Sequence, residues 1–358
     1  MDSKTAERIA EGLGNLNGKI TLGIDGFVDE VWQVIKVRTG PGEYVLFDKM
    51  KELGEAIVQC ETGGFSPEII RKRRSYGGFT GNTGLALGRL GLNPAMIGTY
   101  GKNGIDPAFE ILADSCELFS IGDPCPIYIY EFEDGKMMFA DIDALQDYEW
   151  DAFIKDLGRF EKILLGSDII ALGYWSCIHA FDELVTKICE NFIEGGRCKK
   201  MFFDFADLRK RDGEALRNSL ECLAELNKKV PMIWSLNENE AAQLYSHFGE
   251  VFDETKLEET IARIRGKTGL SELVIHTPYA AAVSNEEEGV AAVKQNHCPN
   301  PVKTVGAGDT FNAGYMAACL CGFGAAERLI TANAATRFYV SNGYPPEVND
   351  IINTLVLY

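Results

Sequence analysis

Residues 303–324 read KTVGAGDTFNAGYMAACLCGFG, in which Gly306, Ala307 and Gly308 form a small-residue turn that opens a helix with apolar residues at helical spacing. Free N–H groups at a helix start, with the positive end of the helix dipole, stabilise negative charge on a transferring phosphoryl group. Asp309, in the first turn, lies where a carboxylate can accept the proton of an attacking hydroxyl. The alternative role for Asp309 is an ordinary helix N-cap.

Short β-like runs alternate with helical stretches through most of the chain. This rhythm predicts an α/β fold, with a mainly parallel sheet covered by helices on both faces. Such sheets bind ligands beyond the carboxyl ends of their strands, so residues that follow the strands are candidates for function. The predicted strands are KITLGI (19–24), PAMIGTY (94–100), SDIIALG (167–173), KMFFDFA (200–206), MIWSL (232–236) and ELVIHT (272–277).

Two regions break this rhythm. EVWQVIKV (30–37) and VLF (45–47) are predicted to pair across a TGPGEY turn, and IYIYEFEDGKMMFAD (127–141) is predicted to form a second hairpin. Strands that no helix covers predict a small β lid over a site, and the alternative is a sheet extension with no moving part. We see no repeat or linker, so we expect one domain, residues 1–358, with a lid formed by about 28–76 and 125–142.

The composition argues against several classes of protein. A net charge of −18 repels nucleic-acid backbones and anionic lipid, so we expect neither as a partner. No apolar run approaches the ~20 residues of a membrane span, and the N-terminal sequence lacks the order of a secretory signal. We therefore expect a soluble protein of the cytoplasm.

The ten cysteines are spread over the whole chain, mostly in apolar stretches, so we expect reduced and packed thiols. No CxxC pair is present and the four histidines are scattered, which argues against structural zinc.

Three motifs in order along the chain resemble one known family. TVGAGDTFNAG is similar to the catalytic signature of the ribokinase-like (PfkB) superfamily of carbohydrate and nucleoside kinases. GGFTGNTGLALGRLG (77–91) resembles the N-terminal substrate signature, and WSLNENEAAQL (234–244) resembles the N-x-x-E element. The resemblance covers nearly the whole chain. It implies a three-layer α/β/α fold with a small β-sheet lid, and transfer of phosphate from ATP to a hydroxyl of a sugar or a sugar-like molecule.

The resemblance also implies roles at the acceptor end of the site. Asp309 would be the general base, and the turn Gly306, Ala307 and Gly308 the anion hole. Gly77 and Gly78 would let the backbone approach the acceptor, while Asn82 would bind its hydroxyls. The alternative for this second group is a glycine-rich turn with an asparagine cap.

The first strand carries a further acceptor-binding acid in this family. In GIDGFVDEV (23–31), both Asp25 and Asp29 are candidates, and neither has the expected spacing. The expected acidic position, counted from Gly23, falls on Val28, so Asp29 fits only if a one-residue insertion is assumed. The alternative is a pair of solvent-facing acids at a turn.

The nucleotide side of the site is also implied by the resemblance. Glu240 would order the water shell of Mg²⁺ on the ATP phosphates with support from Asn237, although NENEAAQL is also a plain acidic helix start. Thr277 matches a threonine beside the nucleotide, although Pro278 and Tyr279 replace the usual glycine-containing turn. Asn333 would border the adenine, unless it is a capping or surface asparagine.

Lys303 marks a departure from the family pattern. Many relatives have Asp two residues before the Gly-Ala-Gly turn, where it helps to bind a monovalent cation, and this chain has Lys303-Thr304 before Val305. Either the lysine ammonium replaces that charge or the cation site is absent. We expect weak or no potassium activation.

The acceptor itself stays open among sugars, sugar acids, sugar phosphates and nucleosides. If RKRRSY (71–76) is a strand, alternation places Arg71 and Arg73 on one face and Lys72 and Arg74 on the other. One of these pairs could then bind an anionic acceptor. The alternative is a charged edge strand that prevents pairing with another strand.

An aromatic pair follows the strand 167–173. Tyr174 and Trp175 either stack on the acceptor or pack in the core.

The sequence leaves two rival functions open and argues against a third. A kinase of the same fold that uses ADP is one, although such relatives are usually longer. A non-catalytic sensor of sugars or nucleotides is another. The third, a dinucleotide-dependent oxidoreductase suggested by GLGNLNG (12–18), is set aside because these glycines precede the first strand. The sequence does not determine the oligomeric state, although open lid edges favour a homodimer formed through the lid.

Overall fold

The central sheet of the computed structural model contains nine strands among the residues that the structure describes, 2–60 and 63–358. In the order β14-β13-β12-β11-β10-β9-β1-β5-β6, every neighbouring pair from β12 to β6 is parallel, and β13 and β14 are antiparallel. All six predicted strands are confirmed within a few residues at their ends. The strands are β1 (Ile20–Gly23), β5 (Ala95–Gly98), β6 (Glu117–Ser120), β9 (Ile169–Gly173), β10 (Lys200–Asp204), β11 (Met232–Asn237), β12 (Glu272–His276), β13 (Ala280–Asn285) and β14 (Gly289–Lys294).

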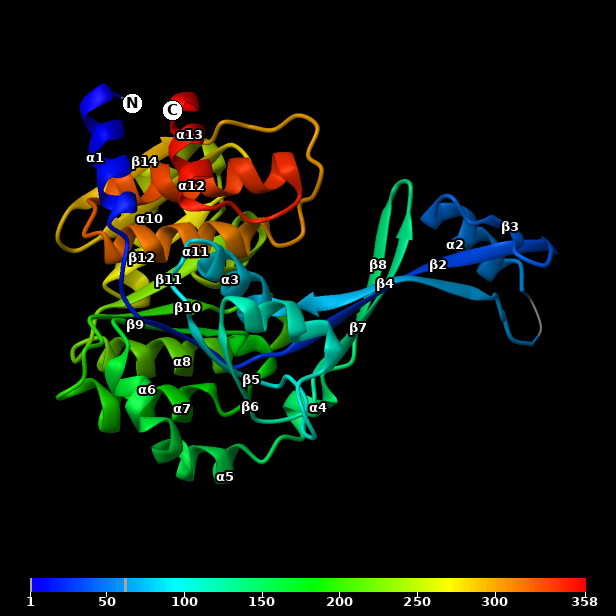
Figure 1. Cartoon of the computed structure of the whole chain (residues 1–358), viewed down its shortest axis with the longest axis horizontal. Helices are drawn as coiled ribbons and strands as arrows, with labels where there is room; N and C mark the ends of the chain where they lie inside the picture. The colour runs from blue at the N-terminus through cyan, green and yellow to red at the C-terminus, as the bar shows by residue number, and fades with distance from the viewer. Residues whose placement is uncertain (1, 61–62) are drawn as a thin grey trace.

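Helices cover both faces of this sheet, as Figure 1 shows. On one face lie α1 (Ser3–Gly14), α3 (Gly78–Arg89), α11 (Ala307–Leu320), α12 (Ala325–Asn342) and α13 (Val348–Thr354). On the other lie α5 (Trp150–Lys155), α6 (Glu161–Gly166), α7 (Phe181–Ile188), α8 (Gly213–Leu226), α9 (Glu238–His247) and α10 (Leu257–Thr268). The predicted three-layer α/β/α fold is confirmed.

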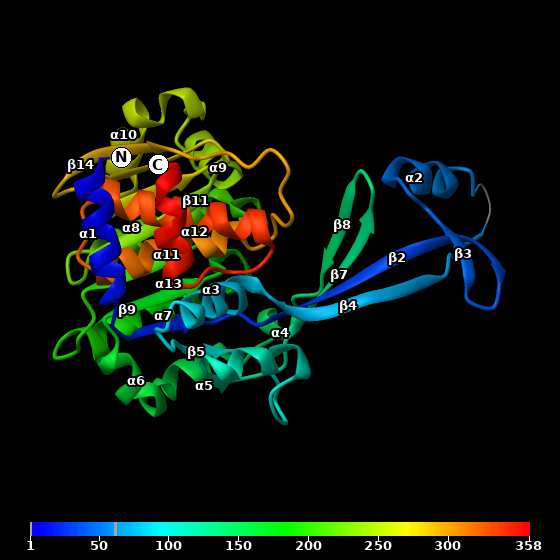
Figure 2. The same cartoon turned by 45° about the horizontal axis from the view of Figure 1, so that its top comes forward.

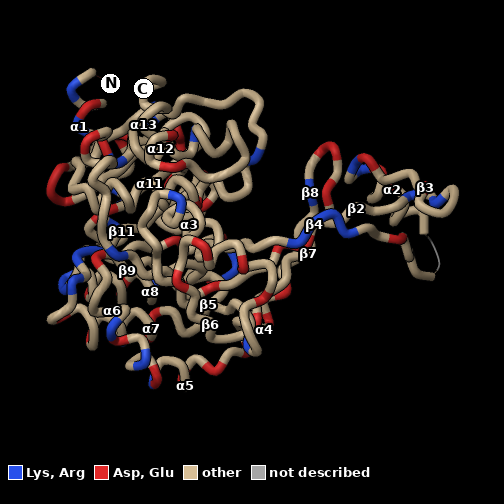
Figure 3. The backbone as a smooth tube through the Cα atoms, in the orientation of Figure 1, with Lys and Arg blue, Asp and Glu red and all other residues tan. Residues whose placement is uncertain are grey.

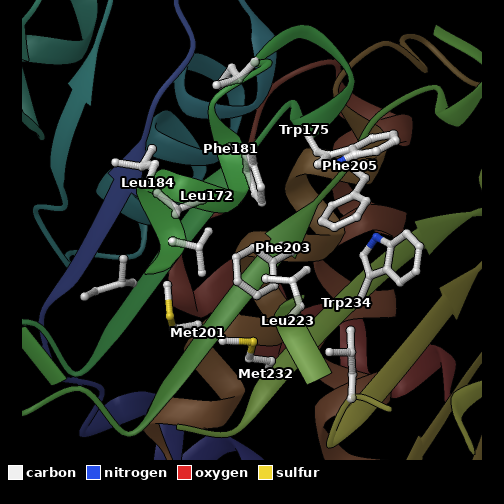
Figure 4. Close-up of a cluster of buried hydrophobic side chains, with 14 of the residues drawn as sticks. Leu172, Trp175, Phe181, Leu184, Met201, Phe203, Phe205, Leu223, Met232 and Trp234 are labelled. Carbon is white, nitrogen blue, oxygen red and sulfur yellow. The ribbon is translucent and has the colours of Figure 1, made fainter. Parts of the chain in front are cut away.

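Alternation along the strands builds two hydrophobic cores. In β10, Phe202 faces the core under α11 and α12, whereas Met201 and Phe203 face the opposite core. Figure 4 shows this second core, where Phe203 and Phe205 lie near Trp234. Strands buried on both faces are expected to be apolar along their whole length, and every residue of β9 is buried.

A second, smaller sheet projects from the body (Figures 1 and 2). Its strands fall in the two ranges predicted for the lid to within one residue at their ends, and both predicted hairpins are present. That this sheet is a lid that closes over a site stays a prediction. The helix at its far end was not predicted. The elements are β2 (Phe27–Gly40), β3 (Glu43–Leu46), α2 (Met50–Val58), β4 (Ile69–Gly77), β7 (Cys125–Phe132), β8 (Gly135–Ala140) and, after the sheet, α4 (Asp143–Gln146).

The predicted alternation of the basic residues in β4 is wrong. Arg73 pairs with Val31 of β2, but Arg71 pairs with the next residue, Trp32, because a β-bulge interrupts the register. Arg71 and Arg73 therefore lie on opposite faces. Arg74 forms two hydrogen bonds with the carboxylate of Asp106, at 2.5 and 2.7 Å, so it is already paired. Figure 3 shows these basic residues along β4, an edge strand that pairs with β2.

In the described part of the chain, none of the helices combines the length and the apolar character needed to cross a membrane.

Candidate active site

The catalytic signature forms the predicted turn and helix start. Gly306 is the N-cap of α11 and has the left-handed conformation, φ 86°. A side chain there would be disfavoured by that φ, and a Cβ would lie 2.7 Å from the Tyr339 hydroxyl. The helix begins at Ala307, so the N–H groups of its first turn are available to an anion.

Asp309 does not cap the helix. Its Oδ2 accepts a hydrogen bond of 2.9 Å from Nδ2 of Asn82, at the start of α3, and the cap position belongs to Gly306. Burial raises the pKa of Asp309 well above that of an ordinary carboxyl, and the nearby charge of Asp204 raises it further, while the Asn82 hydrogen bond opposes the shift. This environment favours the protonated form of the carboxyl group more than water does, so Asp309 holds a proton more tightly than an ordinary aspartate.

Asp25 and Asp29 both lie against the glycine pair that joins β4 to α3. A Cβ on Gly78 would clash with Oδ2 of Asp25, and a Cβ on Gly77 would clash with Oδ1 of Asp29. Asp25 is fully buried and accepts a hydrogen bond from the backbone N–H of Thr80 through Oδ1, while Oδ2 has no partner. Burial raises the pKa of Asp25 to about 7.

Asp29 is less enclosed and lies among cations. Burial raises its pKa to about 6, and the charges of Lys136, Arg73 and Lys303 oppose the shift. These cations come from β8, from β4 and from the segment before α11. The two candidate acids are therefore neighbours with different surroundings, one buried with an unpartnered oxygen and one in a basic environment.

Sequence reasoning missed Asp204, the last residue of β10. Its Oδ1 accepts a hydrogen bond from the backbone N–H of Ala206 at 3.1 Å, and its Oδ2 accepts one from Nδ2 of Asn312 at 3.0 Å. Ser235 of β11 donates to the Asn312 side chain at 2.7 Å, which links α11 to two strand ends. Burial raises the pKa of Asp204 to about 6. The sequence signal that could have identified Asp204 is a carboxylate at the end of a strand predicted to be buried.

Asn237 and Glu240 form a capping box at the start of α9. Oδ1 of Asn237 accepts from the N–H of Glu240, and Oε2 of Glu240 accepts from the N–H of Asn237, both at 3.0 Å. Asn237 and Glu240 therefore begin a helix, as the alternative interpretation of this segment predicted. Burial and then the charge of Asp204 raise the pKa of Glu240 to about 8, so Glu240 belongs to the same group of carboxyls as Asp309.

A pocket of about 480 Å³ lies at the N-terminus of α11. Asn237, Thr277, Ala307 and Gly308 line it, together with residues that sequence reasoning missed, among them His276, Phe311 and Arg337. The His276 ring stacks on Phe311 with centroids 4.5 Å apart, and burial lowers the pKa of His276 to about 4, so this imidazole is neutral. The only sequence signal that could have identified His276 is its position in an otherwise apolar strand.

Two residues predicted to lie beside the nucleotide differ in their surroundings. The Thr277 hydroxyl accepts hydrogen bonds from the N–H groups of Tyr279 and Ala280, which closes the turn between β12 and β13. Asn333 is buried in α12, its Nδ2 has no partner, and it does not line the pocket. The structure therefore does not bring Asn333 together with the other site residues.

Lys303 borders a second hollow, of about 420 Å³, with Asn82, Gly306 and Tyr339. Its ammonium lies 5.5 Å from the centroid of the Tyr339 ring, and burial lowers its pKa while Asp29 and Asp309 oppose the shift. The positive charge of Lys303 therefore lies beside the Gly306–Gly308 turn.

Comparison with known proteins identifies the family. The model of the prokaryotic ketohexokinase family matches residues 2–358. This chain belongs to that family. A curated relative, the ketohexokinase of Haloferax volcanii, is 26% identical over 341 residues, which cover 93% of this chain and 90% of the relative. Family members are ATP-dependent carbohydrate kinases, and this protein is one of them; the resemblance to the ribokinase-like superfamily is confirmed.

Solved structures support the fold. Arabidopsis thaliana ribokinase complexed with ribose and ATP has a TM-score of 0.65 at 16% identity and covers 94% of this chain and 98% of its own. Phosphofructokinase-2 from Escherichia coli, in complex with substrates and products, has a TM-score of 0.61 at 15% identity and covers 95% and 98%. A putative E. coli ribokinase II in complex with ATP and Mg²⁺ has a TM-score of 0.64 at 16% identity and covers 96% and 100%.

Proposed function

We propose that this protein transfers the γ-phosphoryl group of ATP to a hydroxyl of a ketohexose, with Asp309 as the general base. The observation that carries the proposal is the position of Asp309, bonded to Asn82 at the α11 N-terminus. The pocket that Thr277 lines reaches the turn at Ala307 and Gly308, and the acids Asp25 and Asp29 lie against the glycine pair at the start of the helix that carries Asn82. The substrate class follows the Haloferax relative, a ketohexokinase.

The chemistry follows from these positions. Asp25, Asp29 and Asn82 hold the acceptor hydroxyls, and the acceptor approaches the backbone at Gly77 and Gly78, where side chains do not fit. Asp309 takes the proton of the attacking hydroxyl, and its raised pKa makes the carboxylate a stronger base than an ordinary aspartate. The N–H groups of the turn from Gly306 to Gly308 stabilise the charge on the phosphoryl oxygens.

The carboxyls on the nucleotide side fit a hydrated Mg²⁺. Glu240 and Asp204 act on each other electrostatically, and a divalent cation between them and the phosphates would relieve their mutual repulsion. Within the described residues, groups of three or more metal-ligating side chains are absent, which is compatible with an ion held by phosphates, water and one or two carboxylates. When bound, Mg²⁺ neutralises charge that develops on the phosphates.

The test is phosphoryl transfer from Mg·ATP and Mg·ADP across ketohexoses, aldoses, sugar acids, sugar phosphates and nucleosides. We expect turnover with ATP on ketohexoses and a fall of about 10²–10⁴-fold in kcat for Asp309→Asn. Asp212→Asn is the matched control, because Asp212 is an ordinary N-cap that accepts from the N–H of Ala215 at 2.7 Å. Sugar binding without turnover would instead favour the sensor, and turnover with ADP alone would favour the ADP-dependent rival.

We also propose that the protein forms a homodimer through the lid and works in the cytoplasm. Exposed apolar side chains on the lid support the first point, among them Val45 at 51%, Met138 at 47% and Phe139 at 57% exposed. The ten unpaired cysteines support a reducing compartment.

A further inference from the structure

Tyr174 directly follows β9 and has a backbone conformation that side chains disfavour. Its φ of 61° and ψ of 43° lie in the left-handed region, where glycine is free of the steric cost. In the described part of the chain, three non-glycine residues have positive φ, and two of them, Tyr174 and Ala206, donate backbone N–H groups to Asp204. Backbone strain of this kind concentrates at functional sites.

The Tyr174 ring lies beside the glycine pair. Its centroid is 5.0 Å from that of Phe27, and a Cβ on Gly78 would lie 2.7 Å from the same Phe27 ring. Gly173, just before Tyr174, packs so closely on Phe79 that a Cβ there would clash with it. The C-terminal end of β9 is therefore in contact with the start of α3, where the acceptor is expected to bind.

The next residue has a different environment. Trp175 is fully buried, its Nε1 donates to Ser219 at 2.7 Å, and its ring stacks on Phe205 with centroids 5.1 Å apart, as Figure 4 shows. Core packing therefore accounts for Trp175. Tyr174 is only partly buried, and the charged groups that act on its hydroxyl are Asp309, Asp25 and Asp204.

We propose that Tyr174 contacts the acceptor, with its ring as the apolar floor of the site and its hydroxyl as a hydrogen-bond donor to an acceptor oxygen. The inference rests on the proposed function. When the carboxyl groups around Tyr174 are ionised they are acceptors only, so they bind the O–H groups of a sugar but leave its oxygen lone pairs without donors. Tyr174 and Asn82 supply donors there, and the aromatic face fits the C–H face of a neutral, polyhydroxylated acceptor.

Two further considerations support this role. Burial and the charge of Asp309 raise the pKa of Tyr174 well above its ordinary value, so the hydroxyl keeps its proton throughout the physiological range. A site that donates a hydrogen bond to one substrate oxygen discriminates against an analogue that lacks it. Tyr174 is thus a specificity-determining residue for the acceptor and has no role in nucleotide binding.

The test removes only the hydroxyl, in Tyr174→Phe, which keeps the ring and its contact with Phe27. With the acceptor that the wild type phosphorylates, we expect kcat/KM to fall about tenfold, mainly through KM, with the KM for Mg·ATP unchanged. Tyr245→Phe is the matched control, since Tyr245 is buried on α9 and its hydroxyl pairs with Thr260 at 2.8 Å; we expect its acceptor KM to be unchanged.

A series of deoxy analogues of that acceptor sharpens the test. For one analogue, the wild type should lose activity while Tyr174→Phe shows no further loss, because the same hydrogen bond is missing from both. An unchanged acceptor KM in Tyr174→Phe, or an equal loss for every analogue, would overturn the proposal even when the kinase activity is present. If the wild type shows no turnover, the proposed function fails, and calorimetric titration with the sugar then tests the role of Tyr174 separately. Unchanged sugar affinity in Tyr174→Phe, or no sugar binding to the wild type, would overturn that role.

Discussion

Asp309 is surrounded by Asp25, Asp204 and Glu240, and this environment has a consequence for the pH dependence of catalysis. Because burial and these charges raise its pKa, the base form is populated only above the ordinary carboxyl range. We expect kcat/KM to rise with pH along an acid limb whose midpoint lies well above the ~3.9 of a free Asp side chain. Asn82→Ala removes the hydrogen bond that opposes the shift, so its limb should move to higher pH. A wild-type midpoint near 4 would contradict the assignment.

Lys303 places a fixed ammonium behind the Gly306–Gly308 turn, beside Asn82 and Tyr339. We expect kcat to be the same in potassium and in choline chloride at equal ionic strength, because the lysine charge takes the place of a bound cation. Lys303→Ala should lower kcat and leave the KM for the sugar largely unchanged. Strong activation of the wild type by potassium would show that the lysine does not serve this purpose.

At the scale of elements, the junction between β4 and α3 leaves no room for a side chain. Gly78 has φ +79°, and a Cβ there would clash with Asp25 and approach Phe27 to 2.7 Å. We expect Gly78→Ala to lose acceptor binding and to be destabilised by about 1–3 kcal/mol. Gly91→Ala is the matched control at the other end of α3, with φ +84° and open space around the added methyl group. Gly91→Ala should lose some stability and keep the acceptor KM of the wild type. Equal kinetic defects in Gly78→Ala and Gly91→Ala would contradict a specific role of Gly78 in acceptor binding.

The elements also show which sequence predictions succeeded. Continuous apolar runs such as β9 identified the sheet strands, because burial on both faces demands them. The register of β4 was wrong, because a bulge opposite Val31 and Trp32 leaves no local signal among four adjacent basic residues. The helix α2 was missed, because its short apolar side packs only on the small core of the lid around Val34 and Phe47.

For the whole molecule, the buried carboxyls make stability depend on pH. With pKa values of about 7 for Asp25 and about 8 for Glu240, the folded protein binds more protons than the unfolded chain between pH 6.5 and 8. Stability should therefore fall as pH rises through this window. His276, with a folded pKa of about 4, acts in the opposite direction only below about 6.5, where the unfolded imidazole is protonated.

Thermal unfolding of the nucleotide-free protein between pH 6.5 and 8 checks this expectation. Asp25→Asn should flatten the dependence, and high salt should not, because burial shields the group from screening whereas repulsion among surface charges is screened. A melting temperature that rises with pH over this range would contradict the expectation.

The exposed apolar side chains of the smaller sheet, the proposed lid, are the basis for expecting a dimer. We expect the wild type to be a dimer by light scattering and Phe139→Glu to be monomeric, because the change places a charge on the exposed apolar side of β8. Val251→Glu is the control, since Val251 is 87% exposed on the body, in the segment that follows α9. A monomeric wild type, or dimers in both variants, would contradict an interface at Phe139.

The sequence by itself determined the layers of the fold, the hairpins of the lid and the family, because periodicity and the motif around Asp309 are local properties of the chain. It also named both acids at the glycine pair. Only the tertiary structure decided that Asp25 lies at Gly78 and Asp29 at Gly77, and that Asp204 lies in the same cluster of carboxyls as Asp309. It also decided that Tyr174 lies near these carboxyls while Trp175 is buried in the core. These facts depend on which strand ends meet at one edge of the sheet. Neighbours in space from β1, β9, β10 and α11 are far apart in sequence, so no local pattern specifies their contacts.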